Sequence, residues 1–482
     1  MGTRRLSGSP RWFGATLLVL AVGCALVAFL KISGGEAWIP ALYVVVGCTA
    51  LFAWRLVRWP DTWARYFSIG AVLLLACVLN RILFLLDYLL SGPRFDEWPF
   101  YARQPEWALF KGELITILGT MLTVFAWSAF GGLQTSPAQL FKMTDRNSRP
   151  LIVLYALSLA GLILGAVFPE AVGALGQLLP TLFGVGLTVS FIIPMKIFRR
   201  GPRQLLGVVV AGAPFLLAAL GTGMKENLII ALLPSAVLAW RVIRNPALRV
   251  GMILLGVSVV GLITAYVGLY RAEVWQAHVS RSNTEVVSDF VDDVQSRGAP
   301  SVITAGVQQF VKRNNASLHR GWAVSLADEH RFYPDLVFEP LVYVFVPRVF
   351  WPEKPRIRQG WEYSGILYGR QYIAWSNSSS AAGLFTSFYL GGGWLAVLVG
   401  ALGVGVVLAV CTRLCRRVAG NIAAGLYVFS VLPGMLRMDE EWSVGVLSGP
   451  ILSAVYVIGV FTIAKGIAPG LFGARRNASE IT

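Results

Sequence analysis

Twelve apolar runs, most of them about as long as a bilayer is thick, recur along this chain and constrain its fold more than any other feature. A helix that crosses the hydrocarbon core of a membrane needs about 20 apolar residues. The runs lie near residues 12–31, 38–54, 66–90, 108–130, 150–168, 173–194, 204–221, 227–241, 250–270, 383–410, 421–436 and 442–464. Charged residues make up only 14% of the chain, against roughly 25% in soluble domains. The sequence therefore predicts an all-α polytopic membrane protein with about 12 transmembrane helices.

The distribution of Lys and Arg predicts how this protein is oriented in the membrane. If the N-terminus is cytoplasmic, 22 of these residues lie in loops on the cytoplasmic side and five lie in short loops on the other side. Cytoplasmic loops of membrane proteins carry such an excess. We therefore expect a multi-pass protein with both termini in the cytoplasm. Topology and attraction to anionic lipid account for much of the net charge of +16, so it does not indicate nucleic-acid binding.

One long connection divides the chain into three parts. Residues 1–270 form the first nine spans, residues 271–382 form a large loop outside, and residues 383–482 form three more spans and a cytoplasmic tail. A loop of this length without structure of its own is uncommon in a compact protein. Apolar residues at helical spacing predict amphipathic helices around 286–294 and 303–311 at the outer membrane surface, followed by a helix over 336–350 at the bilayer edge.

The most informative motif lies near the end of this loop, where residues 340–356 read PLVYVFVPRVFWPEKPR. Three prolines within nine residues remove backbone donors and fix φ, so the apolar run Leu341–Val346 must end in a stiff, non-helical corner. The corner holds Arg348, Lys354, Arg356 and Arg358 at the edge of an apolar surface. Fixed cations in such a place suit a site that grips an anionic group attached to a lipid.

Individual residues of the loop allow two interpretations. Arg348 and Lys354 could grip a pyrophosphate, or their long side chains could simply reach to the lipid headgroups. His319 and His330 could act as a base or orient an acceptor hydroxyl, although a histidine in a surface loop often has neither role. Asp335 and Glu339 could be the base instead, or could simply pair with Arg348 or Arg331.

Aromatic side chains crowd the same region. The rings of Trp351, Trp361 and Tyr363 could stack on sugar C–H surfaces. The same residues also form ordinary aromatic belts at membrane interfaces.

Other polar residues lie in or beside the spans. Lys225, in a glycine-containing turn at 221–226, is either an anion site or part of an ordinary hairpin. Asn80, Arg81 and Asp87 lie in the third run, and Lys111 and Glu113 in the fourth, where we expect them to neutralise each other within the bundle.

Two acidic clusters and the cysteines are the remaining candidate residues. Asp96-Glu97 and Asp439–Glu441 have no diagnostic metal-binding spacing, and no cysteine lies in the large loop. We therefore predict no metal site at these acidic residues and no disulfide framework in the large loop.

The apolar run, Pro347-Arg348, Trp351-Pro352 and Lys354-Pro355 together resemble the signature of the oligosaccharide repeat-unit (O-antigen, Wzy-type) polymerases. In that family a motif PR-x-x-W-P-x-K-P closes the large outer loop. The likeness extends to the Gly223–Lys225 turn and to the glycine-rich segment 389–393. The family leads one to expect a carboxylate just before that segment, where this chain has Thr386-Ser387.

The resemblance implies a GT-C-like fold and an inverting, metal-independent glycosyl transfer without a cofactor. A glycan on undecaprenyl pyrophosphate would pass to a fresh lipid-linked repeat unit at the outer face of the bacterial cytoplasmic membrane, making O-antigen or exopolysaccharide. Partners would be the lipid-linked substrate, membrane lipids and a chain-length regulator. The pyrophosphate would contact several cations, which are Arg348, Lys354, Arg356, Lys225, Arg320 and Arg271. His319 or His330 would orient or deprotonate the hydroxyl group of the acceptor sugar.

Four rival functions remain open on the sequence, and one of them is a purely structural membrane scaffold, against which Arg348 at an apolar edge argues. A lipid-linked oligosaccharide flippase would favour two related halves and a cationic central cavity. A glycan ligase of the same fold would differ only in its acceptor. A metal-dependent membrane glycosyltransferase would place its chemistry on Asp96-Glu97.

Overall fold

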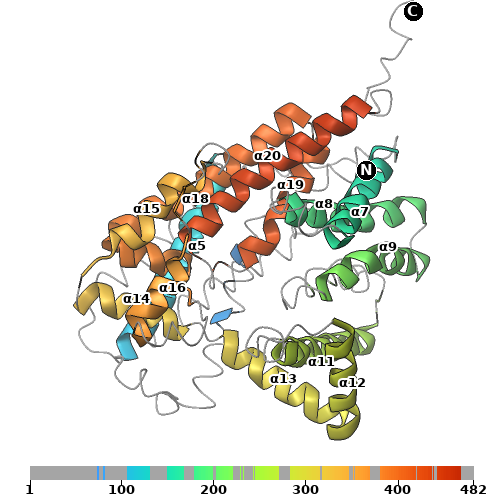
Figure 1. Ribbon diagram of the computed structural model, residues 1–482, viewed down its shortest axis with the longest axis horizontal. Helices are drawn as coiled ribbons and strands as arrows, with labels where there is room; N and C mark the ends of the chain where they lie inside the picture. Colours follow the sequence, from blue (N-terminus) through green and yellow to red (C-terminus); the bar gives the residue numbers. More distant parts are fainter. Residues whose placement is uncertain are drawn as a thin grey trace, which may run out of the picture. The chain divides into compact units, whose positions relative to one another are not determined.

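Every regular element described by the computed structural model is an α-helix (Figure 1). The structure describes residues 73, 74, 77, 80, 81, 106–130, 149–167, 178–198, 202–220, 228, 232, 243, 245–270, 283–314, 317–329, 331–346, 351, 353–355, 357–369, 380–419, 421–436, 438 and 442–467. They divide between two compact units, each made of several chain segments. The first comprises residues 1–138, 311–413 and 434–452, and the second comprises residues 139–310, 414–433 and 453–482.

Eight of the twelve predicted apolar runs form helices. These are α5 (Glu106–Ala129), α7 (Arg149–Val167), α8 (Leu178–Ile197), α9 (Pro202–Leu220), α11 (Pro246–Tyr270), α18 (Leu384–Ala419), α19 (Asn421–Leu436) and α20 (Ser443–Ile467). Among the described residues, four helices, α5, α11, α18 and α20, are long and apolar enough to cross a membrane. The runs near 12–31, 38–54, 66–90 and 227–241 lie wholly or mostly outside the described residues, so the count of twelve spans stays a prediction.

Large apolar side chains point outward from several of these helices. In α11, Leu254 and Leu255 are each 63% exposed, and α9 exposes Leu206, Val210 and Leu217 to a similar degree. Contiguous apolar surface of this kind is rare on soluble monomers. The surfaces fit helices that face lipid.

Helices α7, α8 and α9 of the second unit pack around one aromatic ring. Phe215 of α9 makes edge contacts with Tyr155 of α7 and Phe183 of α8, at 5.9 Å between ring centroids in both cases. Gly186 of α8 allows this approach, because a Cβ there would lie 2.2 Å from Phe215.

The two predicted amphipathic helices of the large loop are confirmed as α12 (Asn283–Arg297) and α13 (Ala299–Asn314). Both pack against the second half of α11. Phe290 of α12 meets Tyr266 edge to face at 5.6 Å, and Gly306 of α13 crosses Gly261 so closely that neither position has room for a Cβ.

The predicted helix over 336–350 exists but is shorter, and two further loop helices escaped the sequence reasoning. Helix α15 runs over Pro334–Val344, while α14 (Ser317–Glu329) and α16 (Gln359–Tyr368) were not expected. Because Pro347 has no N–H to bond the carbonyl of Tyr343, the helix cannot continue past the corner. The N–H of Val346 bonds that carbonyl instead, at 3.1 Å, in a final turn.

Helix α18 breaks at the glycine-rich segment. Gly392 has φ −176° and Gly393 has φ 65° and ψ −154°, so neither is helical. A Cβ at Gly400 would lie 2.5 Å from the ring of Phe388, although twelve residues of straight helix extend about 18 Å. The chain therefore turns sharply at the glycines. Beyond the turn α18 packs against α5, where Thr123 Oγ1 donates to the carbonyl of Ala401 at 3.0 Å.

The backbone at Gly393 provides a test of this break. An alanine there would occupy a conformation that costs side-chain-bearing residues about 1–3 kcal/mol, and its Cβ would lie 3.1 Å from Phe332. We expect Gly393→Ala to lower the Tm of the detergent-solubilised protein. Gly403→Ala, in the same helix with open space around its Cβ, should leave Tm equal or raise it. Equal Tm values for the two variants would contradict the break.

Candidate functional site

Two polar clusters of the first unit lie where α5 packs against α14. Gly112 of α5 permits the close approach, because a Cβ there would lie 3.3 Å from the backbone of Arg320. Without a side chain at this point, α14 comes near enough for polar groups on either side of Gly112 to meet its own polar residues.

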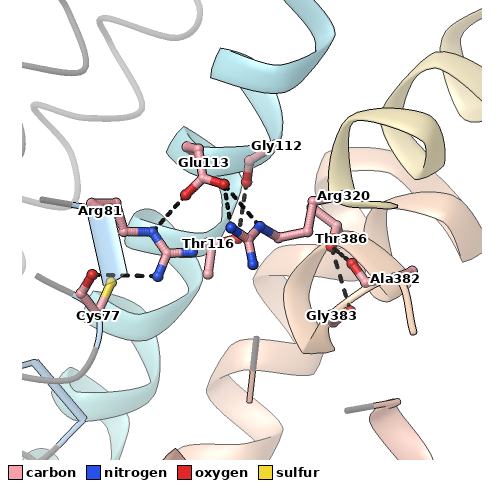
Figure 2. A network of polar contacts seen from close by, with 9 residues as sticks. All are labelled: Cys77, Arg81, Gly112, Glu113, Thr116, Arg320, Ala382, Gly383 and Thr386. Carbon is pink, nitrogen blue, oxygen red and sulfur yellow. Dashed lines mark hydrogen bonds and ion pairs between the residues drawn. The ribbon is translucent and has the colours of Figure 1, made fainter. Parts of the chain in front are cut away.

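The first cluster is a buried carboxylate shared by two guanidinium groups, shown in Figure 2. Glu113 Oε2 lies 2.8 Å from Nε of Arg81, and Glu113 Oε1 accepts from Nε of Arg320 at 2.9 Å and from its Nη2. Arg81 also donates to the carbonyl of Cys77 at 3.3 Å. All three charged side chains are at most 1% exposed. We call these residues the Arg81–Glu113–Arg320 triad.

Hydroxyl groups near the triad bond to helix carbonyls. Thr116 Oγ1 donates to the carbonyl of Gly112 at 2.9 Å. Thr386 donates to the carbonyl of Ala382 and Ser387 donates to that of Leu384 (Figure 2 shows Thr386). Both residues are fully buried at the start of α18, where the resemblance leads one to expect a carboxylate.

The second cluster surrounds the carboxylate of Asp328, near the C-terminal end of α14. Lys111 Nζ lies 2.5 Å from Oδ2, and the hydroxyl of Tyr389 donates to Oδ1 at 2.6 Å. The Lys111 ammonium also lies 4.9 Å from the ring centroid of Tyr389 and 5.5 Å from that of Trp107. Trp394 completes the cluster by meeting Tyr389 edge to face at 5.5 Å. We call these five residues the Asp328 cluster.

The proline corner is tied back to the end of α15. Nζ of Lys354 donates to the carbonyls of Val344 and Val346, at 3.1 and 2.9 Å. An ammonium at these carbonyls satisfies groups that the helix end leaves unbonded and complements its dipole. Trp351, 40% exposed, packs edge to face on Tyr343 at 6.2 Å. These contacts hold Trp351 and Lys354 against the last part of α15 and the turn that follows it.

A side chain of α16 compensates for a proline inside α15. Pro340 has no N–H for the carbonyl of Leu336, four residues earlier. Gln359 Nε2 donates to that carbonyl at 2.7 Å, which joins α16 to α15. The sequence signal for a contact of this kind was Pro340 itself, because the buried carbonyl that a proline leaves unbonded needs a donor from elsewhere.

His319 and Tyr363 are linked within the same unit. Burial and the neighbouring guanidinium of Arg320 lower the pKa of His319 from 6.5 to about 4, so the imidazole is neutral at pH 7. The hydroxyl of Tyr363 donates to the backbone carbonyl of His319 at 2.6 Å. The Tyr363 ring is fully buried against Trp442, which gives it a packing role in this conformation.

The structure describes some of the predicted site residues and not others. His319, Arg320, Lys354, Trp351, Trp361 and Tyr363 are described, whereas His330, Arg348, Arg356, Lys225 and Arg271 lie outside the described residues.

Neutralisation between the third and fourth apolar runs is confirmed for Arg81 with Glu113, but Lys111 pairs with Asp328 of the loop instead. Sequence reasoning missed Trp107, Tyr389 and Trp394. The only signals for them were that Tyr389 and Trp394 flank the glycines 391–393 and that Trp107 lies at the start of α5.

Within the described part of the chain, no three His, Cys, Asp or Glu side chains are grouped closely enough to hold a metal ion. The acidic residues Asp96-Glu97 and Asp439–Glu441 lie outside this part of the chain.

A family described as a domain of unknown function (DUF8712) matches residues 118–436, which are 319 of the 482 residues, and the chain belongs to it. The match begins inside α5, after Glu113, and includes α14, the proline corner and the break of α18. No curated protein and no solved structure matches the chain. Family membership therefore assigns no activity.

Removing the carboxylate of the triad should destabilise the first unit strongly. Glu113→Gln leaves two buried guanidinium groups without their shared anion, a loss of about 3–5 kcal/mol for a broken buried pair. We expect a clearly lower Tm and less monodisperse protein in detergent. Glu329→Gln, at the exposed end of α14, serves as the control and should match the unsubstituted protein. Replacing Arg81, Glu113 and Arg320 together by Met, Leu and Met should recover much of the Tm. An unchanged Tm for Glu113→Gln would contradict the role of the triad.

The lowered pKa of His319 predicts acid sensitivity. Between pH 6.5 and about 4 the unfolded chain binds a proton at this residue and the folded chain does not, so stability falls as the pH drops through this window. His319→Gln removes this contribution. The Tm of the variant should fall by a few degrees less than that of the unsubstituted protein between pH 7 and pH 4.5. Parallel Tm curves over this range would contradict the assignment.

Proposed function

We propose that this member of the DUF8712 family is a membrane glycosyltransferase that polymerises oligosaccharide repeat units carried on undecaprenyl pyrophosphate. It would have twelve spans in a GT-C-like arrangement and make O-antigen or exopolysaccharide at the outer face of the bacterial cytoplasmic membrane. One observation carries the proposal. The corner of the PR-x-x-W-P-x-K-P motif is closed by its own Lys354, through bonds of 3.1 and 2.9 Å to the end of α15.

Such a closure would suit catalysis, because a cation held on a rigid backbone needs no reorganisation when charge develops. In the proposed reaction a hydroxyl oxygen of the acceptor sugar attacks the anomeric carbon of the donor glycan. The bond from that carbon to the pyrophosphate oxygen breaks, and undecaprenyl pyrophosphate leaves with the electron pair. Arginine binds such an anion through two parallel hydrogen bonds, so Arg348 is the principal proposed contact.

The other cations divide into contacts and positioning residues. Arg356, Lys225 and Arg271 are proposed as further contacts with the pyrophosphate. Lys354 positions the corner through its bonds to Val344 and Val346. Arg320, also predicted as a contact, bonds Glu113 and thereby holds α14 and the adjacent His319 against α5.

His319 or His330 is proposed to receive the proton of the acceptor hydroxyl. His319 has the protonation state that this role requires, because its pKa of about 4 leaves the imidazole neutral at pH 7. The same low pKa makes it a weak base, so its contribution would be to orient the hydroxyl as well as to accept the proton.

Trp351 and Trp361 are the proposed sugar-contacting rings of the loop. Trp351 is exposed and Trp361 is partly exposed, so both offer ring surface to a ligand. Trp361 also lies 5.6 Å from the guanidinium of Arg358. The buried ring of Tyr363 instead supports the backbone of His319.

Substitution of Arg348 tests the proposal. Arg348→Ala should reduce chain extension by at least a hundredfold, because it removes the principal stabilisation of the departing pyrophosphate. The measurement is a ladder of polymer lengths, made from lipid-linked repeat units by the full-length protein in proteoliposomes. Arg297→Ala removes an exposed arginine, paired with Asp293 on α12, and should leave the ladder unchanged. Full-length polymer from Arg348→Ala would refute the proposed clamp.

The same assay separates the rival functions. Transfer to a different acceptor without lengthening would indicate a ligase, and movement of the lipid-linked substrate across the bilayer without new bonds would indicate a flippase. Activity lost in EDTA and restored by Mg²⁺ or Mn²⁺ would favour chemistry at Asp96-Glu97.

A further inference from the structure

We infer that the Asp328 cluster is a binding subsite for an uncharged sugar ring of the glycan. The cluster joins three helices, with Trp107 and Lys111 from α5, Asp328 from α14, and Tyr389 and Trp394 from α18. The inference rests on the proposed function only in supposing that the ligand of this protein is a glycan.

The charges of the cluster favour a neutral ligand over an anion. Lys111 and Asp328 form one cation–carboxylate pair at 2.5 Å. A phosphate that approached the ammonium would also meet the Asp328 carboxylate, and like charges at this range repel strongly. A hydroxyl group suffers no such repulsion and can donate to the carboxylate. The pair therefore selects against pyrophosphate and for a polyhydroxylated, uncharged group.

Asp328 retains hydrogen-bonding capacity for such a group. An ionised carboxylate offers about four acceptor positions, two on each oxygen. Lys111 occupies one position on Oδ2 and Tyr389 occupies one on Oδ1. With 23% of its side chain exposed, Asp328 can accept further hydrogen bonds, one on each oxygen. Two neighbouring hydroxyl groups of a sugar ring match this arrangement.

The aromatic residues supply an apolar surface beside the carboxylate. Trp107 and Trp394 are partly exposed, whereas Tyr389 is only 4% exposed and serves to hold Asp328. Indole faces pack against the C–H surface of a sugar while its hydroxyl groups bond the polar residues. A carboxylate flanked by accessible indole rings therefore combines both kinds of contact.

The break of α18 is required to build this subsite. In a continuous helix Tyr389 and Trp394 would be separated by five steps of about 100°, which directs them about 140° apart around the axis. In the structure their rings make an edge contact at 5.5 Å, on either side of Gly391–Gly393. The break thus brings both rings to one cluster. A helix that only had to cross the membrane would not need such a break.

The subsite lies on the same helix as the triad. Asp328 follows Arg320 by eight residues in α14, which is about 12 Å of helix. Since α14 also contains His319, a sugar bound at Asp328 would be held at a fixed distance from the residue proposed to serve the acceptor hydroxyl. The subsite would therefore position the acceptor glycan.

Binding of a lipid-free glycan tests the inference. The probe is the repeat-unit oligosaccharide released by mild acid from its polyprenyl pyrophosphate carrier, titrated into the full-length protein in nanodiscs and followed by saturation-transfer NMR. Asp328→Asn and Trp394→Leu should each raise the Kd at least tenfold. Asp293→Asn removes another ion-paired carboxylate, on α12, and should leave the Kd unchanged. If Asp328→Asn does not fold, Lys111→Met is the second variant, because it removes the cation that pairs with the Asp328 carboxylate.

Several outcomes would overturn the subsite. These are the absence of oligosaccharide binding, an unchanged Kd in Trp394→Leu together with either polar variant, and displacement of the oligosaccharide by millimolar inorganic pyrophosphate. Failure of the proposed function would look different. If the protein binds the oligosaccharide through Asp328 yet forms no polymer from lipid-linked units, the subsite is supported and the proposed polymerase function is contradicted.

Discussion

The described part of the first unit depends on one carboxylate. Glu113 joins three chain segments, because Arg81, α5 and α14 meet at its two oxygens in an environment that excludes solvent. Charges are costly to bury and stable only when each finds its partner in good geometry. The triad therefore fixes which part of the loop packs against α5. Gly112 makes the contact sterically possible by leaving room for the backbone of Arg320.

Interruptions of helices create the polar features beside this contact. The glycines of α18 turn the chain so that Tyr389 and Trp394 meet, and Tyr333 N–H bonds the carbonyl of Leu390 at 2.8 Å next to the break. Pro340 frees a carbonyl in α15 that Gln359 recovers. In a membrane protein such breaks are tolerated where other groups satisfy the freed backbone. Here the satisfying groups also join the loop helices to each other.

The two clusters on α5 and α14 differ in their exposure to solvent. The triad is inaccessible and holds helices together, whereas the Asp328 cluster is partly exposed and electrically balanced. At the proline corner, Lys354 bonds the carbonyls of Val344 and Val346. For the proposed polymerase this separates three tasks, which are holding the loop, binding the sugar and stabilising the departing pyrophosphate. Separation is physically reasonable, because a site that binds phosphate strongly is poorly suited to select a neutral sugar.

The sequence by itself determined the helical class, the eight described apolar helices and the two amphipathic helices. It also indicated that α15 ends near the proline corner, although the predicted last residue, 350, lies six residues beyond the observed Val344. Those features follow from local periodicity and from the missing N–H of proline, which act within a few residues. It also indicated that Arg81 and Glu113 would pair. Only the tertiary structure decided that Arg320 joins them, that Lys111 takes Asp328 as its partner, and that Trp107, Tyr389 and Trp394 gather around it. Asp328 and Lys111 are 217 positions apart, and which distant charges meet depends on how helices pack and where they break, which no local pattern specifies.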